Sequence, residues 1–335
     1  MKMLLGIDVG SVSTDIAILN EEGDVLTSRY LRTKGNPIEV IKRGLGEIEK
    51  ELNDKGIEPD VAAVGTTGSA RYLAGVVVGA DLVKNEISAH AFATIRQVPE
   101  VRTIFEIGGQ DSKIILIRDK IVIDFGMNSV CAAGTGSFLD HQAERLGIDI
   151  TKFGDYSLKA DNPVRIAGRC TVFAESDMIH KQQMGASTED IIGGLCEALV
   201  RNYLNNVARG KELLPPFVFQ GGVSENIGIK KAFEKTLNHE VIIPKNNKIM
   251  GAIGAALLAK HDIEKNPREA AFKGFRVART NYKTRTFYCN ACPNNCEVYE
   301  IKEGNKVIAR WGDICGRWSE GLKRMKKVKV NKVDP

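Results

Sequence analysis

The clearest structural signal in the sequence is TIFEIGGQDSK at residues 103–113, an apolar run that ends in a turn rich in glycine, acidic and amide side chains. Two further apolar runs follow, Ile114–Arg118 and Ile121–Phe125, and Asp119 and Lys120 form a tight turn between them. Short apolar runs separated by turn residues are typical of antiparallel strands joined as a meander. This region is therefore predicted to form three consecutive strands, the first at Thr103–Ile107, with the glycine-rich turn after it.

The same pattern occurs near the amino-terminus. The stretch MLLGIDVGSVST at residues 3–14 begins with the apolar run Met3–Ile7 and ends in a turn of glycine, acidic and hydroxyl residues at Asp8–Thr14. Strands are predicted next at Asp15–Leu19 and Val25–Leu31. Two copies of one strand–turn–strand device predict an α/β protein with duplicated halves.

The remaining segments complete two lobes and an extension. Apolar residues at helical spacing predict helices, and short apolar runs predict further strands. We expect a core at residues 1–265, with lobes at about 1–98 and 99–265, followed by a basic, cysteine-rich extension at 266–335. The predicted helices are Pro37–Lys55, Asn85–Gln97, Gly136–Leu146, Asp190–Asn205 and Gly251–Lys260, and the further strands are Val61–Val64 and Phe217–Gln220.

Composition excludes several classes of protein. Of the 335 residues, 43% are hydrophobic and 27% are charged, so the chain can bury a substantial core and is not disordered throughout. No apolar run approaches the roughly 18–20 residues that a transmembrane helix needs. Asp8 interrupts the first apolar run before a signal peptide could develop. We expect a cytoplasmic protein that does not enter the membrane.

Charge is distributed unevenly along the chain. Residues 271–335 contain 15 Lys and Arg against 6 Asp and Glu and include a lysine-rich run at Lys323–Lys332, whereas the rest of the chain is mildly acidic. A basic segment can bind nucleic acid or an acidic protein, or can simply be solvated. Aromatic residues interleave with the basic ones, but packing explains them as well. We therefore do not expect nucleic acid as a partner.

Three glycine-rich turns each follow an apolar strand, at residues 8–14, 106–113 and 221–226. Glycine lets backbone N–H groups approach phosphate oxygens, hydroxyl groups add donors, and a nearby carboxylate can hold hydrated Mg²⁺. Such turns are common, so one alone is weak evidence for phosphate binding. No Walker A sequence is present, and no Gly-x-Gly-x-x-Gly opens a helix after the first strand, which argues against P-loop and dinucleotide-binding folds.

Two strand–turn–strand loops and a downstream Gly-Gly turn resemble the ATPase superfamily of actin, sugar kinases and Hsp70. This resemblance implies duplicated ribonuclease H-like lobes, with residues 8–14 and 106–113 as the two phosphate loops and 221–226 as the adenosine loop. The superfamily usually has Asp at the start of the second loop, where this chain has Glu106, and Asp111 is another carboxylate nearby. The resemblance thus implies that ATP and Mg²⁺ bind to these loops.

Three motifs narrow the resemblance to one family. GGQDSK at residues 108–113, CAAGTG at 131–136 and CTVFAES at 170–176 resemble the activators of 2-hydroxyacyl-CoA dehydratases, a family that includes the ATP-driven components of benzoyl-CoA reductases. The resemblance covers about residues 1–262. The catalytic residues that it implies are Asp8, Glu106, Gln110 and Asp111. The cofactor-binding residues that it implies are Gly10, Ser11, Ser13, Thr14, Gly108, Gly109, Lys113, Gly134, Thr135, Gly136, Gly221, Gly222, Val223 and Asn226.

Cys131 and Cys170 are each followed by a segment that can begin a helix. The positive end of a helix lowers the pKa of a thiol and favours an anionic iron–sulfur cluster. A [4Fe–4S] cluster normally takes four thiolates, so two copies of the chain related by a two-fold axis would supply the set. The family resemblance implies the same shared cluster. The alternative is that both thiols are buried in packing, which is the role that we expect for Cys196.

The extension carries four more cysteines in the pattern Cys289-x2-Cys292-x3-Cys296, with Cys315 after 18 further residues. This spacing is typical of a metal site and suits Zn²⁺ or a second iron–sulfur cluster equally. Metal binding would add folding energy to a segment with little core of its own. The alternative is four unligated thiols. A similar stretch occurs in larger, fused relatives of the family, whereas compact activators lack it, which leaves the partner open.

These inferences favour a homodimeric, ATP-dependent electron-transfer protein of anaerobic metabolism. Its donor would be a ferredoxin or flavodoxin, and its acceptor a low-potential iron–sulfur enzyme such as a 2-hydroxyacyl-CoA dehydratase. Nucleotide binding would change the angle between the lobes. Glu175 and His180 are expected to lie at the surface, and the alternative is that they couple nucleotide to cluster. Two alternatives remain: a small-molecule kinase of the same superfamily, and a nucleotide-binding regulator whose tail binds nucleic acid.

Overall fold

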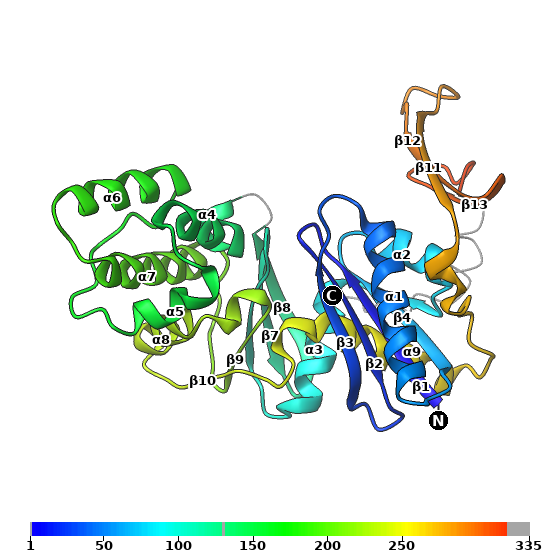
Figure 1. Cartoon of the computed structure of the whole chain (residues 1–335), viewed down its shortest axis with the longest axis horizontal. Helices are drawn as coiled ribbons and strands as arrows, with labels where there is room; N and C mark the ends of the chain where they lie inside the picture. The colour runs from blue at the N-terminus through cyan, green and yellow to red at the C-terminus, as the bar shows by residue number, and fades with distance from the viewer. Residues whose placement is uncertain (1, 129–130, 320–335) are drawn as a thin grey trace. The chain divides into compact units, whose positions relative to one another are not determined.

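The computed structural model describes residues 2–128 and 131–319, and the lysine-rich run at Lys323–Lys332 lies outside them. The described chain divides into two units (Figure 1). Unit 1 combines the residues up to Ala89 with those from Gly251 onward, and unit 2 runs between these two segments. Each unit is built around one five-stranded sheet.

The sheet of unit 1 has the strand order β3-β2-β1-β4-β5. β1 (Lys2–Val9), β2 (Ser13–Leu19) and β3 (Val25–Arg32) form an antiparallel meander, as the turn pattern predicts. β4 (Asp60–Thr67) and β5 (Leu82–Val83) add in parallel on the other side of β1. The β1–β2 hairpin therefore presents the first glycine-rich turn at the end of the sheet where β4 also ends.

α1 (Pro37–Asp54) covers the sheet of unit 1 with one apolar stripe. Its first residue is a proline, whose missing N–H costs nothing at a helix start. The stripe belongs to one apolar cluster with the inward side chains of β1 and β2. Its most deeply buried members are Ile41, Leu45, Ile48 and Leu52.

α9 (Met250–Lys265) lies directly on the central strands of unit 1, because glycines leave room for its backbone. A Cβ atom added at Gly6 of β1 would lie 1.8 Å from a carbonyl oxygen of α9, and one added at Gly65 of β4 would lie 1.9 Å from another. α9 therefore packs with unit 1, whereas we expected it in a lobe at residues 99–265. The sequence contains these glycines but does not say which helix they face.

Replacing Gly65 by alanine should destabilise the protein by about 3 kcal/mol, because the added methyl group meets the α9 backbone and not a flexible side chain. Denaturant unfolding followed by circular dichroism measures this change. Gly46 of α1 is the matched control, since a Cβ atom there meets only the Ala278 methyl group, at 3.5 Å. Gly46→Ala should be neutral or stabilise by up to about 1 kcal/mol. Equal unfolding midpoints for Gly65→Ala and wild type would contradict this packing.

Unit 2 repeats the topology of unit 1, with the strand order β10-β9-β6-β7-β8. β6 (Thr103–Ile107), β7 (Ser112–Arg118) and β8 (Ile121–Asn128) form the antiparallel meander. β9 (Phe217–Gln220) pairs in parallel with β6, and β10 (Val241–Ile242) pairs in parallel with β9. In each sheet, two parallel strands therefore lie on the free side of the first strand of the meander. The predicted α/β fold with duplicated sheets is confirmed.

Helices complete both units. The core of unit 2 includes the ring of Phe105, which stacks on Phe233 at a centroid distance of 4.8 Å, while Tyr203 contacts both rings edge-on. The Tyr203 hydroxyl also donates to the Lys113 carbonyl oxygen at 2.6 Å, which ties α7 to β7 near the second turn. No helix in the described part of the chain is long and apolar enough to cross a bilayer. The further helices are α2 (Arg71–Val78), α3 (Glu86–Gln97), α4 (Gly136–Leu146), α5 (Phe153–Ser157), α6 (Thr171–Gln183), α7 (Thr188–Asn206) and α8 (Ile227–Leu237).

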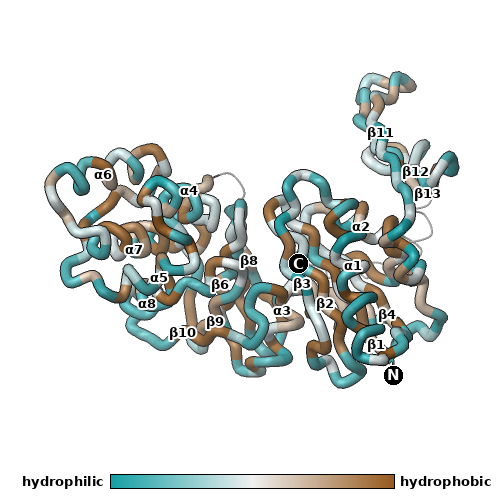
Figure 2. The backbone as a smooth tube through the Cα atoms, in the orientation of Figure 1, coloured by the Kyte–Doolittle hydropathy of each residue, from teal (hydrophilic) through white to brown (hydrophobic). Residues whose placement is uncertain are grey.

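The described part of the extension, residues 266–319, packs on unit 1. A 3₁₀ turn, η5 (Phe275–Arg279), lies against α1. β11 (Tyr282–Tyr288), β12 (Glu297–Glu303) and β13 (Lys306–Trp311) form an antiparallel sheet. Each strand contributes a side chain to the apolar cluster of unit 1, whereas β11 is otherwise largely hydrophilic (Figure 2). The extension therefore continues the core of unit 1.

Candidate functional site

The first glycine-rich turn joins β1 to β2 in unit 1. Asp8 lies near the end of β1, and Gly68 follows β4 beside it, where a Cβ atom would come within 2.5 Å of the Asp8 carboxylate. Gly68 has a φ of +94°, so both its backbone and its surroundings require glycine. Gly10 closes the turn by donating its N–H group to the Ser13 carbonyl oxygen at 2.9 Å. A carboxylate beside glycine backbone, which has no side chain to block a ligand, suits a phosphate with its Mg²⁺ ion.

The hydroxyl residues of this turn differ in exposure. Ser11 is exposed and Ser13 is half-buried, so a ligand can reach them. Thr14 is fully buried, and its hydroxyl lies 3.0 Å from that of Thr33, which in turn donates to the Gly10 carbonyl oxygen. The Thr14 side chain therefore supports the turn from within the unit.

The second turn, in unit 2, holds a compact charge cluster. The Lys113 ammonium lies 3.1 Å from Glu106 Oε2 and 2.9 Å from Asp111 Oδ2. Glu106 and Lys113 face each other across β6 and β7 and are almost fully buried, whereas Asp111 is about one-third exposed. Lys113 is a predicted cofactor-binding residue, which stays a prediction, and its ammonium holds together two carboxylates that would otherwise repel each other. Gln110 is the exposed side chain of this turn.

The third turn follows β9 and lies beside the second. A Cβ atom at Gly221, whose φ is +90°, would lie 2.7 Å from Glu106 Oε1, so glycine there brings the two turns together. Asn226 caps α8 by accepting hydrogen bonds from two N–H groups of its first turn, at 3.0 and 3.2 Å. Val223 is buried. Gly221 is buried, and its N–H group donates to the Asn247 carbonyl oxygen, so Gly221, Val223 and Asn226 shape the turn. Half-buried Gly222 is the candidate that can offer backbone to a ligand.

The start of α4 is bonded to the second turn. The N–H groups of Gly136 and Ser137 donate to the carbonyl oxygens of Gly108 and Gly109 at 2.9 and 2.8 Å. Ser137 adds a bond from its hydroxyl to the Gly109 carbonyl oxygen at 2.6 Å. We did not expect a role for Ser137, although a small hydroxyl residue at a helix start is a recognisable signal. Two candidates are buried just before this start and support it, namely Gly134 and Thr135.

Cys131 and Cys170, 39 positions apart in the sequence, lie close together in unit 2. The Cys131 thiol is 3.9 Å from the carbonyl oxygen of Arg169, the residue before Cys170. Cys170 is the N-cap of α6, and Cys131 precedes the 3₁₀ turn η1 (Ala132–Gly134), which leads into α4. Asn128 fixes the Cys131 backbone through hydrogen bonds to its N–H group and its carbonyl oxygen, at 2.9 and 2.7 Å. Both thiols are partly exposed.

This thiol pair fits half of an iron–sulfur site. The N-terminus of a helix stabilises a thiolate through its free N–H groups and positive potential. Partial exposure leaves Cys131 and Cys170 open to ligands from outside the chain. Cys196 differs, because it is fully buried in α7 and burial raises its pKa to about 12. Its predicted place in the core is confirmed.

The sequence matches the BadF/BadG/BcrA/BcrD ATPase family over residues 5–259. The chain belongs to this ATPase family. It is 33% identical to the 2-hydroxyisocaproyl-CoA dehydratase activator of Clostridioides difficile, over 79% of this chain and 97% of the relative. It is 28% identical to a benzoyl-CoA reductase subunit of Thauera aromatica, over 80% of this chain and 96% of the relative. The solved structure of the Clostridium difficile activator with bound ADPNP, 33% identical, matches with a TM-score of 0.70 over 78% of this chain and 96% of that chain.

Membership of the BadF/BadG/BcrA/BcrD ATPase family confirms the resemblance seen in the sequence motifs. The match includes all three turns and the Cys131–Cys170 pair, and it ends before the extension. The family relationship therefore covers the candidate nucleotide and thiol groups but not the cysteines of the extension.

The four cysteines of the extension are not gathered around a common centre. Cys289 is buried, Cys296 is half-buried, and Cys292 and Cys315 are exposed. The Cys289 N–H group donates to the Cys296 carbonyl oxygen at 2.8 Å, so their backbones meet beside the β11–β12 pair. Across residues 2–128 and 131–319, no three His, Cys, Asp or Glu side chains converge as metal ligands. The structure therefore does not show the second metal site expected here, and that site stays a prediction.

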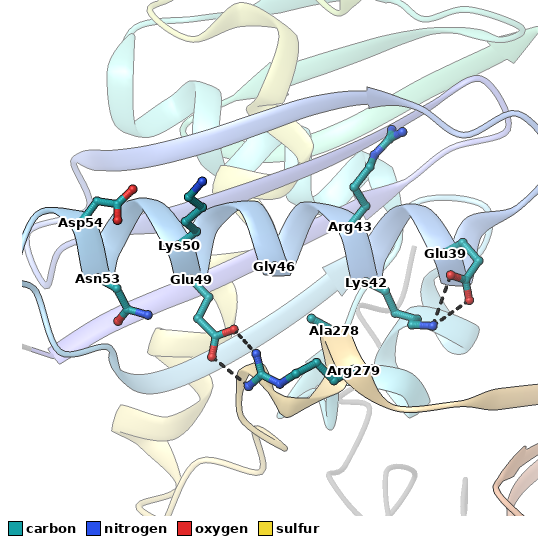
Figure 3. Close-up of a pocket in the computed structure, with 10 residues that line it drawn as sticks. All are labelled: Glu39, Lys42, Arg43, Gly46, Glu49, Lys50, Asn53, Asp54, Ala278 and Arg279. Carbon is teal, nitrogen blue, oxygen red and sulfur yellow. Dashed lines mark hydrogen bonds and ion pairs between the residues drawn. The ribbon is translucent and has the colours of Figure 1, made fainter.

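A charged surface groove of about 660 Å³ lies along α1, and no candidate site residue lines it (Figure 3). The Arg279 guanidinium of η5 donates to both carboxylate oxygens of Glu49, at 2.6 and 3.1 Å. Lys42 pairs with Glu39 at 2.9 Å on the same helix. Charges of both signs neutralise one another along the groove. The pair of Arg279 with Glu49 anchors the extension to α1.

Proposed function

We propose that this chain is an ATP-driven activator that delivers a low-potential electron to a partner iron–sulfur enzyme. Relatives in its ATPase family are named as a dehydratase activator and as part of a benzoyl-CoA reductase. The observation that carries the proposal is the closeness of Cys131 and Cys170, each at the start of a helical segment, in the unit that holds the second turn. A small-molecule kinase needs no such pair of accessible thiols.

The glycine-rich turns bind ATP and carry out its hydrolysis. In unit 2, Glu106 and Asp111 hold a hydrated Mg²⁺ ion, which commonly uses one or two carboxylates together with water and phosphate oxygens. Lys113 keeps these two carboxylates in place, because its ammonium contacts both. Exposed Gln110 orients the attacking water. In unit 1, the Asp8 carboxylate and the backbone of the adjoining turn take part in binding phosphate and metal.

Cys131 and Cys170 supply two thiolates of a [4Fe–4S] cluster, and the same pair from a second copy of the chain supplies the others. Bound there, the cluster supplies a one-electron carrier. Val172 and Phe173 lie two and three residues after Cys170 on α6, and their side chains are 65% and 66% exposed. Two adjacent exposed apolar side chains beside the thiols support a second copy that covers this face.

The electron comes from a ferredoxin or flavodoxin and passes to a low-potential iron–sulfur acceptor, a 2-hydroxyacyl-CoA dehydratase or a related reductase. ATP serves as a conformational input, so its terminal phosphate leaves as inorganic phosphate. We place the protein in the cytoplasm of cells that live without oxygen.

A product analysis separates this function from that of a kinase. The anaerobically purified protein should release inorganic phosphate from ATP without any small-molecule acceptor. An anaerobic pull-down from the source cells should recover an iron–sulfur dehydratase or reductase. A phosphorylated metabolite formed in step with ATP consumption would contradict the proposal. Zinc measured in the same preparation tests the separate prediction for the cysteines of the extension.

A further inference from the structure

Helices α4 and α6 of unit 2 are joined by one carboxylate. On α6, the Glu175 Oε1 atom lies 2.6 Å from Arg145 Nη2, and its Oε2 atom lies 3.6 Å from His141 Nδ1. Arg145 and His141 are four residues apart on α4 and so share one face of that helix. Each oxygen of the carboxylate therefore contacts a different turn of α4. This two-point contact fixes the direction of α6 against α4 better than a single ion pair would.

α4 is tied at its first turn to the second glycine-rich turn. The N–H groups of Gly136 and Ser137 are bonded to the Gly108 and Gly109 carbonyl oxygens. The contact is tight, since a Cβ atom at Gly136 would lie 3.1 Å from the Gly108 oxygen. A ligand that reorients these two peptide groups must therefore move the first turn of α4 or break its hydrogen bonds.

α6 has few other attachments to the unit. Among its 13 residues, all of them described, Ala174 and Met178 are the buried ones. Asp177 accepts a hydrogen bond from the Ala167 N–H group at 2.8 Å. Cys170 is the N-cap of this helix, whereas Cys131 is held by Asn128 at the end of β8. A tilt of α6 therefore displaces Cys170 relative to Cys131.

We propose that Glu175 is the positioning residue that transmits nucleotide binding from the Gly108–Gly109 turn, through α4, to α6 and Cys170. This inference rests on the proposed function, because it requires that the turn binds ATP. Glu175 contacts neither the turn nor the thiols and acts through Arg145 and His141. The sequence favours a surface role for Glu175, whereas its contacts with Arg145 and His141 support the alternative of coupling.

The test measures how fast N-ethylmaleimide alkylates Cys131 and Cys170 in the full, iron-free chain, with and without a non-hydrolysable ATP analogue. Peptide mass spectrometry resolves each cysteine. In wild type, the analogue should change the Cys170 rate by about fivefold or more, the lower range of typical allosteric couplings. Glu175→Gln should bind the analogue within about twofold of wild type but lose this rate change. Combining Glu175→Arg with Arg145→Glu should restore it.

Glu197→Gln is the matched control. Glu197 has comparable exposure and pairs with Arg201 of α7 and Lys235 of α8, not with a residue of α4 or α6, so this variant should keep the wild-type response. A full response in Glu175→Gln would overturn the inference, and so would a wild-type protein that binds the analogue without a rate change at either thiol. Both outcomes leave the proposed function standing. Failure of wild type to bind the analogue would overturn the proposed function, and the inference with it.

Discussion

Cys131→Ser or Cys170→Ser should abolish the iron–sulfur absorption of the reconstituted protein, while affinity for an ATP analogue stays within about twofold of wild type. The effect is large because each substitution occurs twice in a symmetric dimer and removes half of the thiolates from the shared cluster. The nucleotide turns at residues 8–14, 106–113 and 221–226 contain neither Cys131 nor Cys170 and keep all their own residues in these variants. Absorption spectra and iron and sulfide content measure the cluster. Calorimetric titration measures affinity for the analogue.

Two cysteines elsewhere serve as controls for this experiment. Cys292 is exposed in the extension, and Cys196 is buried in α7 with its pKa raised to about 12 by burial, so that it is a poor source of thiolate. Cys292→Ser and Cys196→Ala should both keep the core cluster. Retention of the cluster in both the Cys131 and the Cys170 variants would reject the ligand assignment.

Lys113→Met should lower the free energy of unfolding by about 3 kcal/mol and abolish ATP hydrolysis. The substitution removes the ammonium that lies between Glu106 and Asp111, so a buried carboxylate loses its ion pair and two negative charges are left together. The same two carboxylates are the proposed Mg²⁺ ligands. Denaturant titration and phosphate release measure the two effects.

Lys211→Met is the control for loss of an ion pair whose carboxylate is solvated. Lys211 pairs with Asp124, which is half-exposed, so its loss should cost less than about 1 kcal/mol. Adding Glu106→Gln to Lys113→Met should recover part of the stability, because the buried charge is then gone, but not the hydrolysis. A Lys113→Met protein as stable as wild type would show that the cluster does not depend on this ammonium.

Local patterns were sufficient to predict the meanders and several helices. β6 (Thr103–Ile107) and α4 (Gly136–Leu146) have the predicted bounds, because glycine marks the end of the strand and the start of the helix. α2 (Arg71–Val78) was missed, since its apolar residues Val76–Val78 are consecutive and β-branched, which favours a strand. The place of α9 could not be predicted either. It depends on glycines of β1 and β4 that are far away in the sequence.

Sequence motifs identified the neighbourhood of the candidate site more reliably than the role of each side chain. Lys113 contacts carboxylates and Thr14 supports its turn, because burial and cross-strand partners, which a motif does not show, determine where a side chain points. Cys131 and Cys170 are brought together, since each begins a helical segment of the same unit. The spacing of the extension cysteines gives only the lengths of the loops between them. In the described part of the chain their thiols do not converge on one site.

The shared cluster is tested most directly by light scattering under anaerobic conditions, combined with iron and sulfide analysis of the reconstituted protein. We predict the mass of two chains and one core [4Fe–4S] cluster per pair, which is about two iron atoms per chain. A product that stays monomeric and colourless after iron reconstitution would contradict the proposed activator.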